Sequence, residues 1–252
     1  MIDFHGASSY LRARESARAD VPFMTKHPSR IAAECRPKPL LRGWSHAGAA
    51  VAALATTIAL YALCGDDRPR ALSMLVFGLS MIVLYAVSAT YHIGRWDPRT
   101  ERILRALDHA NIYVLIAGTF TPMCFNVLEG PFRTTMLTVI WSVAAAGVCL
   151  SVFTERLPRW LTARLYVAMG WIGVVLFPAF ASLLPWPALG LLLIGGLLYT
   201  VGAVIYALQR PDPYPHVFGY HEVFHLFVIG GSAAFVVTVW VFVLPFSRAL
   251  AG

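Results

Sequence analysis

Seven apolar runs of about 20 residues each dominate the chain, and an α-helix needs about that length to cross a bilayer. The runs are unbroken rather than alternating in polarity, which argues against a closed β-barrel. Connections between them are short, so sequence neighbours are expected to pack antiparallel. The sequence predicts an all-α membrane protein, a seven-transmembrane helix bundle, with spans at about residues 45–64, 71–92, 108–127, 134–153, 164–184, 188–208 and 221–245.

The charge content agrees with a membrane protein. Only 13% of the 252 residues are charged, against about 25% in an ordinary soluble domain. The net charge of +7 could indicate nucleic acid, but the basic residues lie between the apolar runs, where positive charge sets membrane orientation. We therefore expect a protein embedded in the membrane, with no nucleic-acid partner.

The distribution of Lys and Arg predicts the orientation. Sixteen of the 20 fall on one side of the expected bundle, which places the N-terminus in the cytoplasm and the C-terminus outside. The localisation expected is the cell inner (cytoplasmic) membrane, crossed by several spans. Residues 1–42 are basic and contain no apolar signal segment, so they are expected to form a flexible or surface-lying cytoplasmic tail before a transmembrane domain at residues 43–252.

The four cysteines are Cys35, Cys64, Cys124 and Cys149, and none forms a CxxC pair. This spacing argues against a zinc–thiolate site and favours small apolar packing residues. Cys64 and Cys124 both fall near the expected outer face, so a disulfide between them is an open alternative.

Two histidines open the last apolar run. His221 and His225 are four residues apart, so on a helix their rings lie on one face, one turn apart. Ionisable side chains in a membrane segment indicate a functional site, and two imidazoles at this spacing commonly hold a metal ion. The alternative is a pair of interfacial histidines that hydrogen-bond a neighbouring helix or water.

The expected topology brings further polar residues to the same depth. The second span ends with Ser88 and His92, which share a helix face, and the third span begins at Asp108. Both ends fall on the side where the last span begins. His92, Asp108, His221 and His225 are therefore expected inside the cytoplasmic leaflet, which favours the metal hypothesis.

This set of residues suits zinc. Three neutral imidazoles and one open position are the usual catalytic arrangement, and zinc lowers the pKa of a bound water to about 7. Asp108 could hold that water and take its proton, and its expected place at a helix N-terminus favours its charged form. The Ser88 hydroxyl either donates to the water or a substrate carbonyl, or bonds its own helix backbone.

Other polar residues near these spans carry weaker signals. His109 points about 100° away from Asp108 on a helix, so a supporting or interface role is expected rather than metal binding. Glu222 is expected at the cytoplasmic boundary, with a bond to a ligand imidazole as an alternative. His46 and His216 are expected to be solvated.

The motifs resemble a known family. Ser88-x3-His92, then residues 107–122 with Asp108, and then His221-x3-His225 look like the bacterial hemolysin III family, which belongs with the progestin and adipoQ receptors, including the adiponectin receptors. The resemblance covers about residues 43–245.

What the resemblance implies is a seven-helix bundle with Zn2+ held by His92, His221 and His225 near the cytoplasmic face. It places Asp108 close to the zinc-bound water, makes Ser88 the serine of the motif and puts the N-terminus inside. For the eukaryotic relatives it implies a lipid amidase activity on ceramide, whereas the bacterial family name implies cell lysis.

Three functions follow as hypotheses. The site favours an intramembrane zinc-dependent hydrolase of a lipid amide or ester, with a membrane lipid as substrate or ligand. A receptor-like regulator of membrane homeostasis would instead use zinc as a structural link between helices. A lytic or pore-forming protein would need a polar path across the bilayer, but the fourth to sixth spans are nearly free of charge.

Overall fold

A computed structural model describes residues 39–154 and 157–247. Most of the expected basic tail, including Cys35, lies outside the described residues. The described chain is helical, with one isolated β-bridge between Tyr214 and Phe218. The helices are α3 (Trp44–Leu63), α4 (Arg68–Ile93), α5 (Pro98–Val127), α6 (Gly130–Phe153), α7 (Arg159–Gly170), α8 (Gly173–Leu183), α9 (Trp186–Leu208) and α10 (Tyr220–Thr238), which continues into the π-helical turn η1 (Val239–Val243).

Seven of these segments are long and apolar enough to cross a membrane, with α7 and α8 together forming one and α10 with η1 another. The expected all-α fold with seven spans is therefore confirmed. One detail is wrong: the segment expected as a single helix at 164–184 breaks at Trp171 and Ile172. Gly170 and Gly173 flank the break, and glycine has low helix propensity.

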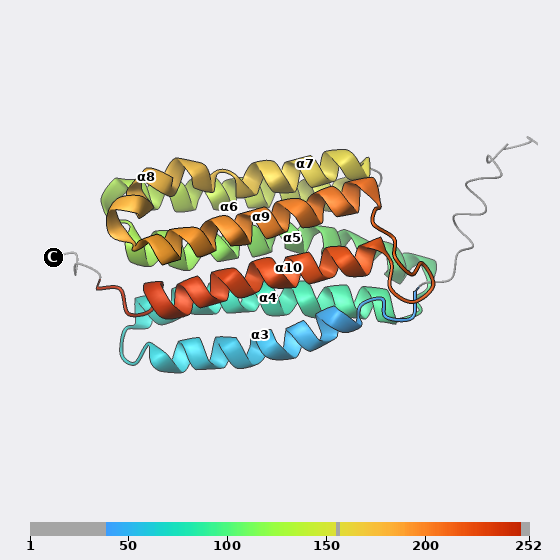
Figure 1. Cartoon of the computed structure of the whole chain (residues 1–252), viewed down its shortest axis with the longest axis horizontal. Helices are drawn as coiled ribbons and strands as arrows, with labels where there is room; N and C mark the ends of the chain where they lie inside the picture. Colours follow the sequence, from blue (N-terminus) through green and yellow to red (C-terminus); the bar gives the residue numbers. More distant parts are fainter. Residues whose placement is uncertain (1–38, 155–156, 248–252) are drawn as a thin grey trace, which may run out of the picture. The chain divides into compact units, whose positions relative to one another are not determined.

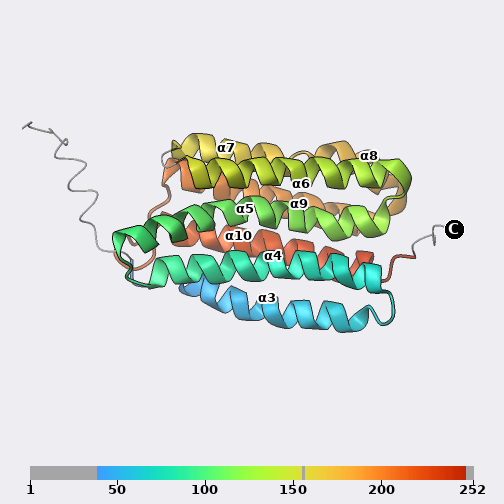
Figure 2. The ribbon, with the colours of Figure 1, turned by 180° about the vertical axis from the view of Figure 1, so that it is seen from behind.

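The helices lie side by side along one direction (Figure 1). In Figures 1 and 2, α3 and α4 form one side of the bundle, α6, α7 and α8 the other, and α5, α9 and α10 lie between them. The consecutive pairs α3–α4, α4–α5, α5–α6 and α9–α10 are in contact. Because their connections are short, the end of α4 and the starts of α5 and α10 meet at one end of the bundle, which we call the histidine end.

Helix α5 begins ten residues before the expected start at 108. The Asp97 side chain caps it by accepting hydrogen bonds from the backbone amides of Arg99 and Thr100 at 3.0 and 3.2 Å, and Pro98 occupies the first turn. These are the usual signals of a helix N-terminus. Asp108 thus lies in the third turn, and its expected stabilisation by the helix dipole is wrong, because that effect is confined to the first turn.

No disulfide joins Cys64 to Cys124 or Cys149. Cys64 and Cys124 are buried in the apolar core, and the Cys64 thiol donates to the Leu60 carbonyl at 3.1 Å. The packing role expected for these two residues is confirmed, and the alternative of a disulfide between them is wrong.

A short segment before α3 packs against the histidine end of the bundle. The backbone amides of Leu40 and Leu41 donate to the carbonyls of His216 and Val217, both at 3.1 Å. Gly43 has φ of +86°, a conformation that favours glycine, and a Cβ there would lie 2.9 Å from the Cβ of His92. The segment is thereby held against both α4 and the loop before α10.

Arg42 in this segment forms an ion pair with Glu222, whose side chain is 1% exposed. The second carboxylate oxygen of Glu222 accepts from the Gly219 amide at 2.6 Å and so caps α10. Glu222 was expected to face the cytoplasmic boundary; in the structure its side chain is buried and joins the segment before α3 to the start of α10.

Helices α3 and α4 approach closely at Gly78. A Cβ at this position would lie 2.2 Å from the Thr57 hydroxyl and 2.7 Å from the Thr57 Cβ. Backbones can approach this closely in membranes where one residue is small.

Gly78→Ala should therefore destabilise the protein by about 1–3 kcal/mol, the range for overpacked cores, as measured by thermal unfolding in detergent. Adding Thr57→Gly to Gly78→Ala should restore part of the lost stability, because it removes the side chain that the new Cβ would meet. Gly48→Ala is the control, because nothing lies within 4 Å of a Cβ there. Equal stability of Gly78→Ala and the wild type would contradict the close approach.

Arg42→Ala should cost about 3 kcal/mol, because it leaves the buried Glu222 carboxylate without its cation. The double variant Arg42→Leu/Glu222→Gln should be more stable than Arg42→Ala in the same unfolding assay. Arg95→Ala removes an exposed arginine and serves as control. A loss no greater than that of the control would show that the ion pair does not stabilise the fold.

Candidate metal centre

Three histidines from two helices meet at the histidine end. His92 lies in the last turn of α4, and His221 and His225 lie in the first two turns of α10. Their exposed fractions are 7%, 9% and 1%. One nitrogen from each ring lies within 4.8 Å of the others, and the Nε2 atoms of His92 and His221 are 3.0 Å apart. The predicted convergence of these three residues is thus present in the structure.

The spacing fits a metal ion. Zinc binds imidazole nitrogen at 2.0–2.1 Å in tetrahedral sites, which separates two ligand nitrogens by about 3.3 Å. The 3.0 Å between His92 and His221 needs only a small opening to reach that value. Buried histidines in a membrane bundle also require partners, and Nδ1 of His225 has none.

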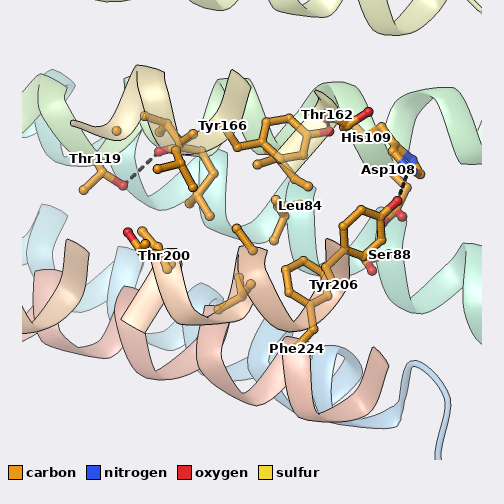
Figure 3. Close-up of a pocket in the computed structure, with 18 of the residues that line it drawn as sticks. Leu84, Ser88, Asp108, His109, Thr119, Thr162, Tyr166, Thr200, Tyr206 and Phe224 are labelled. Carbon is orange, nitrogen blue, oxygen red and sulfur yellow. Dashed lines mark hydrogen bonds between the residues drawn. The ribbon is translucent and has the colours of Figure 1, made fainter. Parts of the chain in front are cut away.

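Asp108 of α5 lies beside this group. Its Oδ2 is 3.7 Å from Nε2 of His92, and its side chain is 14% exposed. The Ser88 side chain interacts with this carboxylate and is 2% exposed. Figure 3 shows both residues at the same end of a pocket. The structure thus brings together the five predicted site residues, with Asp108 as the partner of Ser88.

His109 stays outside the histidine group. Its Nδ1 lies 2.8 Å from the Arg105 carbonyl and its Nε2 lies 3.2 Å from the Tyr206 hydroxyl, a bond visible in Figure 3. The Tyr166 hydroxyl donates to the His109 carbonyl at 3.0 Å. The expected interface role of His109 agrees with these contacts, which join α5 to α7 and α9.

His46 was expected to be solvated, and this is wrong. It is 3% exposed, and its ring stacks on that of His225, with centroids 3.6 Å apart and planes at 14°. Neither ring nitrogen has a well-formed hydrogen bond, although the ring adjoins the His225 backbone. His46 therefore forms part of the wall around the histidine group. Its spacing could have revealed it, because it continues the buried stripe of Ala53, Thr57 and Leu60 on α3. His216, in contrast, is exposed as expected.

The histidine group opens into a chamber of about 980 Å³, at the upper end of the usual range for ligand pockets. Figure 3 shows Asp108 and Ser88 at one end and Thr119 and Thr200 toward the other. Most of the wall between is apolar and comes from α5, α8, α9 and α10, with Leu115, Phe120, Phe177, Leu192, Leu197 and Val228 among its residues.

A small polar cluster lies deeper in the bundle. The Tyr85 hydroxyl donates to the Ser232 hydroxyl at 2.6 Å, and the Tyr199 hydroxyl lies 2.8 Å from the same atom. Thr119 donates to the Leu115 carbonyl of its own helix at 2.8 Å. These groups are hydrogen-bonded to one another or to the backbone, so they add little polarity to the chamber.

Comparison with known proteins agrees with this arrangement. The chain is 37% identical to Hemolysin-3 of Bacillus cereus over 170 residues, which cover 68% of this chain and 74% of that protein. It is 33% identical to the heptahelical transmembrane protein ADIPOR2 of rice (Oryza sativa subsp. japonica) over 194 residues, 69% of this chain and 83% of that protein. It is 26% identical to the human monocyte to macrophage differentiation factor over 202 residues, 78% and 81% of the two chains.

The family model described as haemolysin-III related matches residues 35–236. This range contains the whole histidine group, Ser88 and Asp108. The match, together with the relatives of the adiponectin-receptor kind, shows that the chain belongs to the hemolysin III family, within the superfamily of progestin and adipoQ receptors.

Proposed function

We propose that this protein is an intramembrane zinc-dependent hydrolase that cleaves an amide or ester bond of a membrane lipid. The observation that carries the proposal is the three-histidine group with Asp108 beside it, at the head of an apolar chamber. A carboxylate next to three imidazoles suits hydrolysis, and an apolar chamber of this size suits an acyl chain.

In this proposal His92, His221 and His225 hold the ion. Zinc with three imidazole ligands and one open position supplies a Lewis acid that lowers the pKa of water to about 7. Asp108 positions the attacking water and accepts its proton. Ser88 orients the Asp108 carboxylate through their contact, and His46 supports the ring of His225 by stacking.

We also propose that the histidine end faces the cytoplasm and that the protein resides in the cell inner membrane. The support is the distribution of Lys and Arg: of the eleven in the part of the chain that the structure describes, eight fall in segments at that end of the bundle (Figure 1). The scissile bond of a lipid then meets the histidines at the depth of the inner headgroups, with its acyl chain in the chamber.

A structural metal in a receptor-like regulator is the second candidate. The histidines come from α4 and α10, so an ion would link two helices that are distant in sequence and stabilise the bundle as any native-state ligand does. The position of Asp108 favours the hydrolase, because a structural zinc site has four protein ligands and needs no adjacent base. The name Hemolysin-3 of the Bacillus cereus relative indicates lysis by that protein.

Purified wild-type protein should contain about one zinc per chain, since three imidazoles make one site. His225→Ala should lose most of it, as measured by elemental analysis after dialysis. His216→Ala is the control, because it removes an exposed histidine. Wild-type protein that takes up no zinc at all would end the zinc proposal.

Asp108→Asn should keep the metal and lower hydrolysis by about 100-fold or more, the usual contribution of a general base. The measurement is release of fatty acid from amide and ester lipids by mass spectrometry, with the metal content of the same preparation. Ser88→Ala should lose less activity, because the carboxylate remains. Unchanged turnover in Asp108→Asn would instead favour the structural metal.

A further inference from the structure

Arginines line the chamber at the histidine end. Arg99, Arg102 and Arg105 of α5 and Arg159 of α7 all line it, and all are exposed. We call these four residues the arginine rim. Arg42 also lines the chamber and pairs with Glu222, and the Arg159 guanidinium donates to the Tyr220 hydroxyl at 3.0 Å.

The rim arginines differ from other arginines at this end of the bundle because they line the chamber. Arg95 and Arg164 belong to the same end of the bundle and are exposed, yet they do not line the chamber. The Arg164 guanidinium lies over the Trp160 ring at 4.8 Å. Among the chamber-lining residues that the structure describes, Asp108 is the single acidic one, so arginine outnumbers carboxylate in the described lining at this end.

Helix α5 is long enough to extend the rim beyond the hydrocarbon core. Its 30 residues extend about 45 Å, whereas the hydrocarbon core of a bilayer is about 30 Å thick. Figure 2 shows the first turns of α5 reaching past the neighbouring helix ends. Arg105, Arg102 and Arg99 precede Asp108 by three, six and nine residues, or about 4.5, 9 and 13.5 Å along the axis.

We propose that the lipid substrate carries an anionic headgroup, of the phosphate or carboxylate kind, which the arginine rim binds while the acyl chain fills the chamber. Guanidinium groups bind such anions through paired, charge-assisted hydrogen bonds. With the scissile carbonyl at the histidines, the headgroup extends outward along the three arginine positions of α5. This inference rests on the proposed hydrolase and specifies its substrate class.

The test compares two lipids that differ by one phosphate group, which is anionic at neutral pH. An N-acylethanolamine and its O-phosphate have the same acyl chain and the same amide bond, and hydrolysis of either gives one fatty acid and one amine. Zinc-loaded protein in neutral detergent micelles is assayed with both. The variant Arg102→Gln/Arg105→Gln removes half of the rim, and Arg95→Gln/Arg164→Gln removes two exposed arginines outside it.

Wild-type protein should show a kcat/KM at least tenfold higher for the O-phosphate than for the neutral amide. Arg102→Gln/Arg105→Gln should reduce this ratio at least tenfold through KM, and the control pair should leave it unchanged. A ratio near one, or a ratio that both double variants change equally, would overturn the inference while leaving the hydrolase intact. Inorganic phosphate and the O-phosphate are also compared as inhibitors of hydrolysis of the neutral amide. If inorganic phosphate inhibits as strongly as the O-phosphate, the inference is likewise overturned, because the rim would then be a site for free anions.

Binding separates this inference from the proposed function. If wild-type protein hydrolyses neither lipid, the hydrolase proposal fails. The inference is then tested by binding alone, by measuring how well each of the two lipids displaces a fluorescent fatty acid from the protein. Stronger displacement by the O-phosphate, lost in Arg102→Gln/Arg105→Gln, supports the inference. Equal displacement by the two lipids overturns it.

Discussion

Ionisable side chains cost free energy in hydrocarbon unless they are paired or ligated, and this constraint arranges the bundle. Among the described residues, the histidine group, Asp108 and the Arg42–Glu222 pair lie close together at one end, and the Arg70–Asp67 pair lies at the start of α4. Elsewhere the buried hydroxyls of Thr57, Thr119 and Thr238 bond their own helices. The rest of the interior can therefore be apolar and can accommodate a lipid chain.

Connectivity explains why residues so far apart in sequence meet. Helix α4 ends at the histidine end, α5 begins there, and an even number of crossings later α10 begins there too. Side chains join α4 to α10, with the Nε2 atoms of His92 and His221 3.0 Å apart, and Gly43 lies against His92 from the segment before α3. A site built on helix ends in this way lies at the end of the bundle, where three separate helices contribute its side chains.

Much of this arrangement was predictable from the sequence. The apolar runs predicted the spans, and the four-residue spacing with the parity of the spans predicted the histidine group. The start of α5 was missed because its first turns are charged, although Asp97 and Pro98 mark it clearly. The burial of His46 and Glu222 depends on partners in other helices, which local patterns do not specify.

Glu222 joins the segment before α3 to the first turn of α10. Glu222 adjoins a histidine of the group and caps α10, while its other oxygen holds Arg42 in the segment that follows the N-terminal tail. That segment cannot swing away without either breaking a buried ion pair or shifting the first turn of α10. A displacement of Arg42 is therefore transmitted through Glu222 to the first turn of α10, which carries His221.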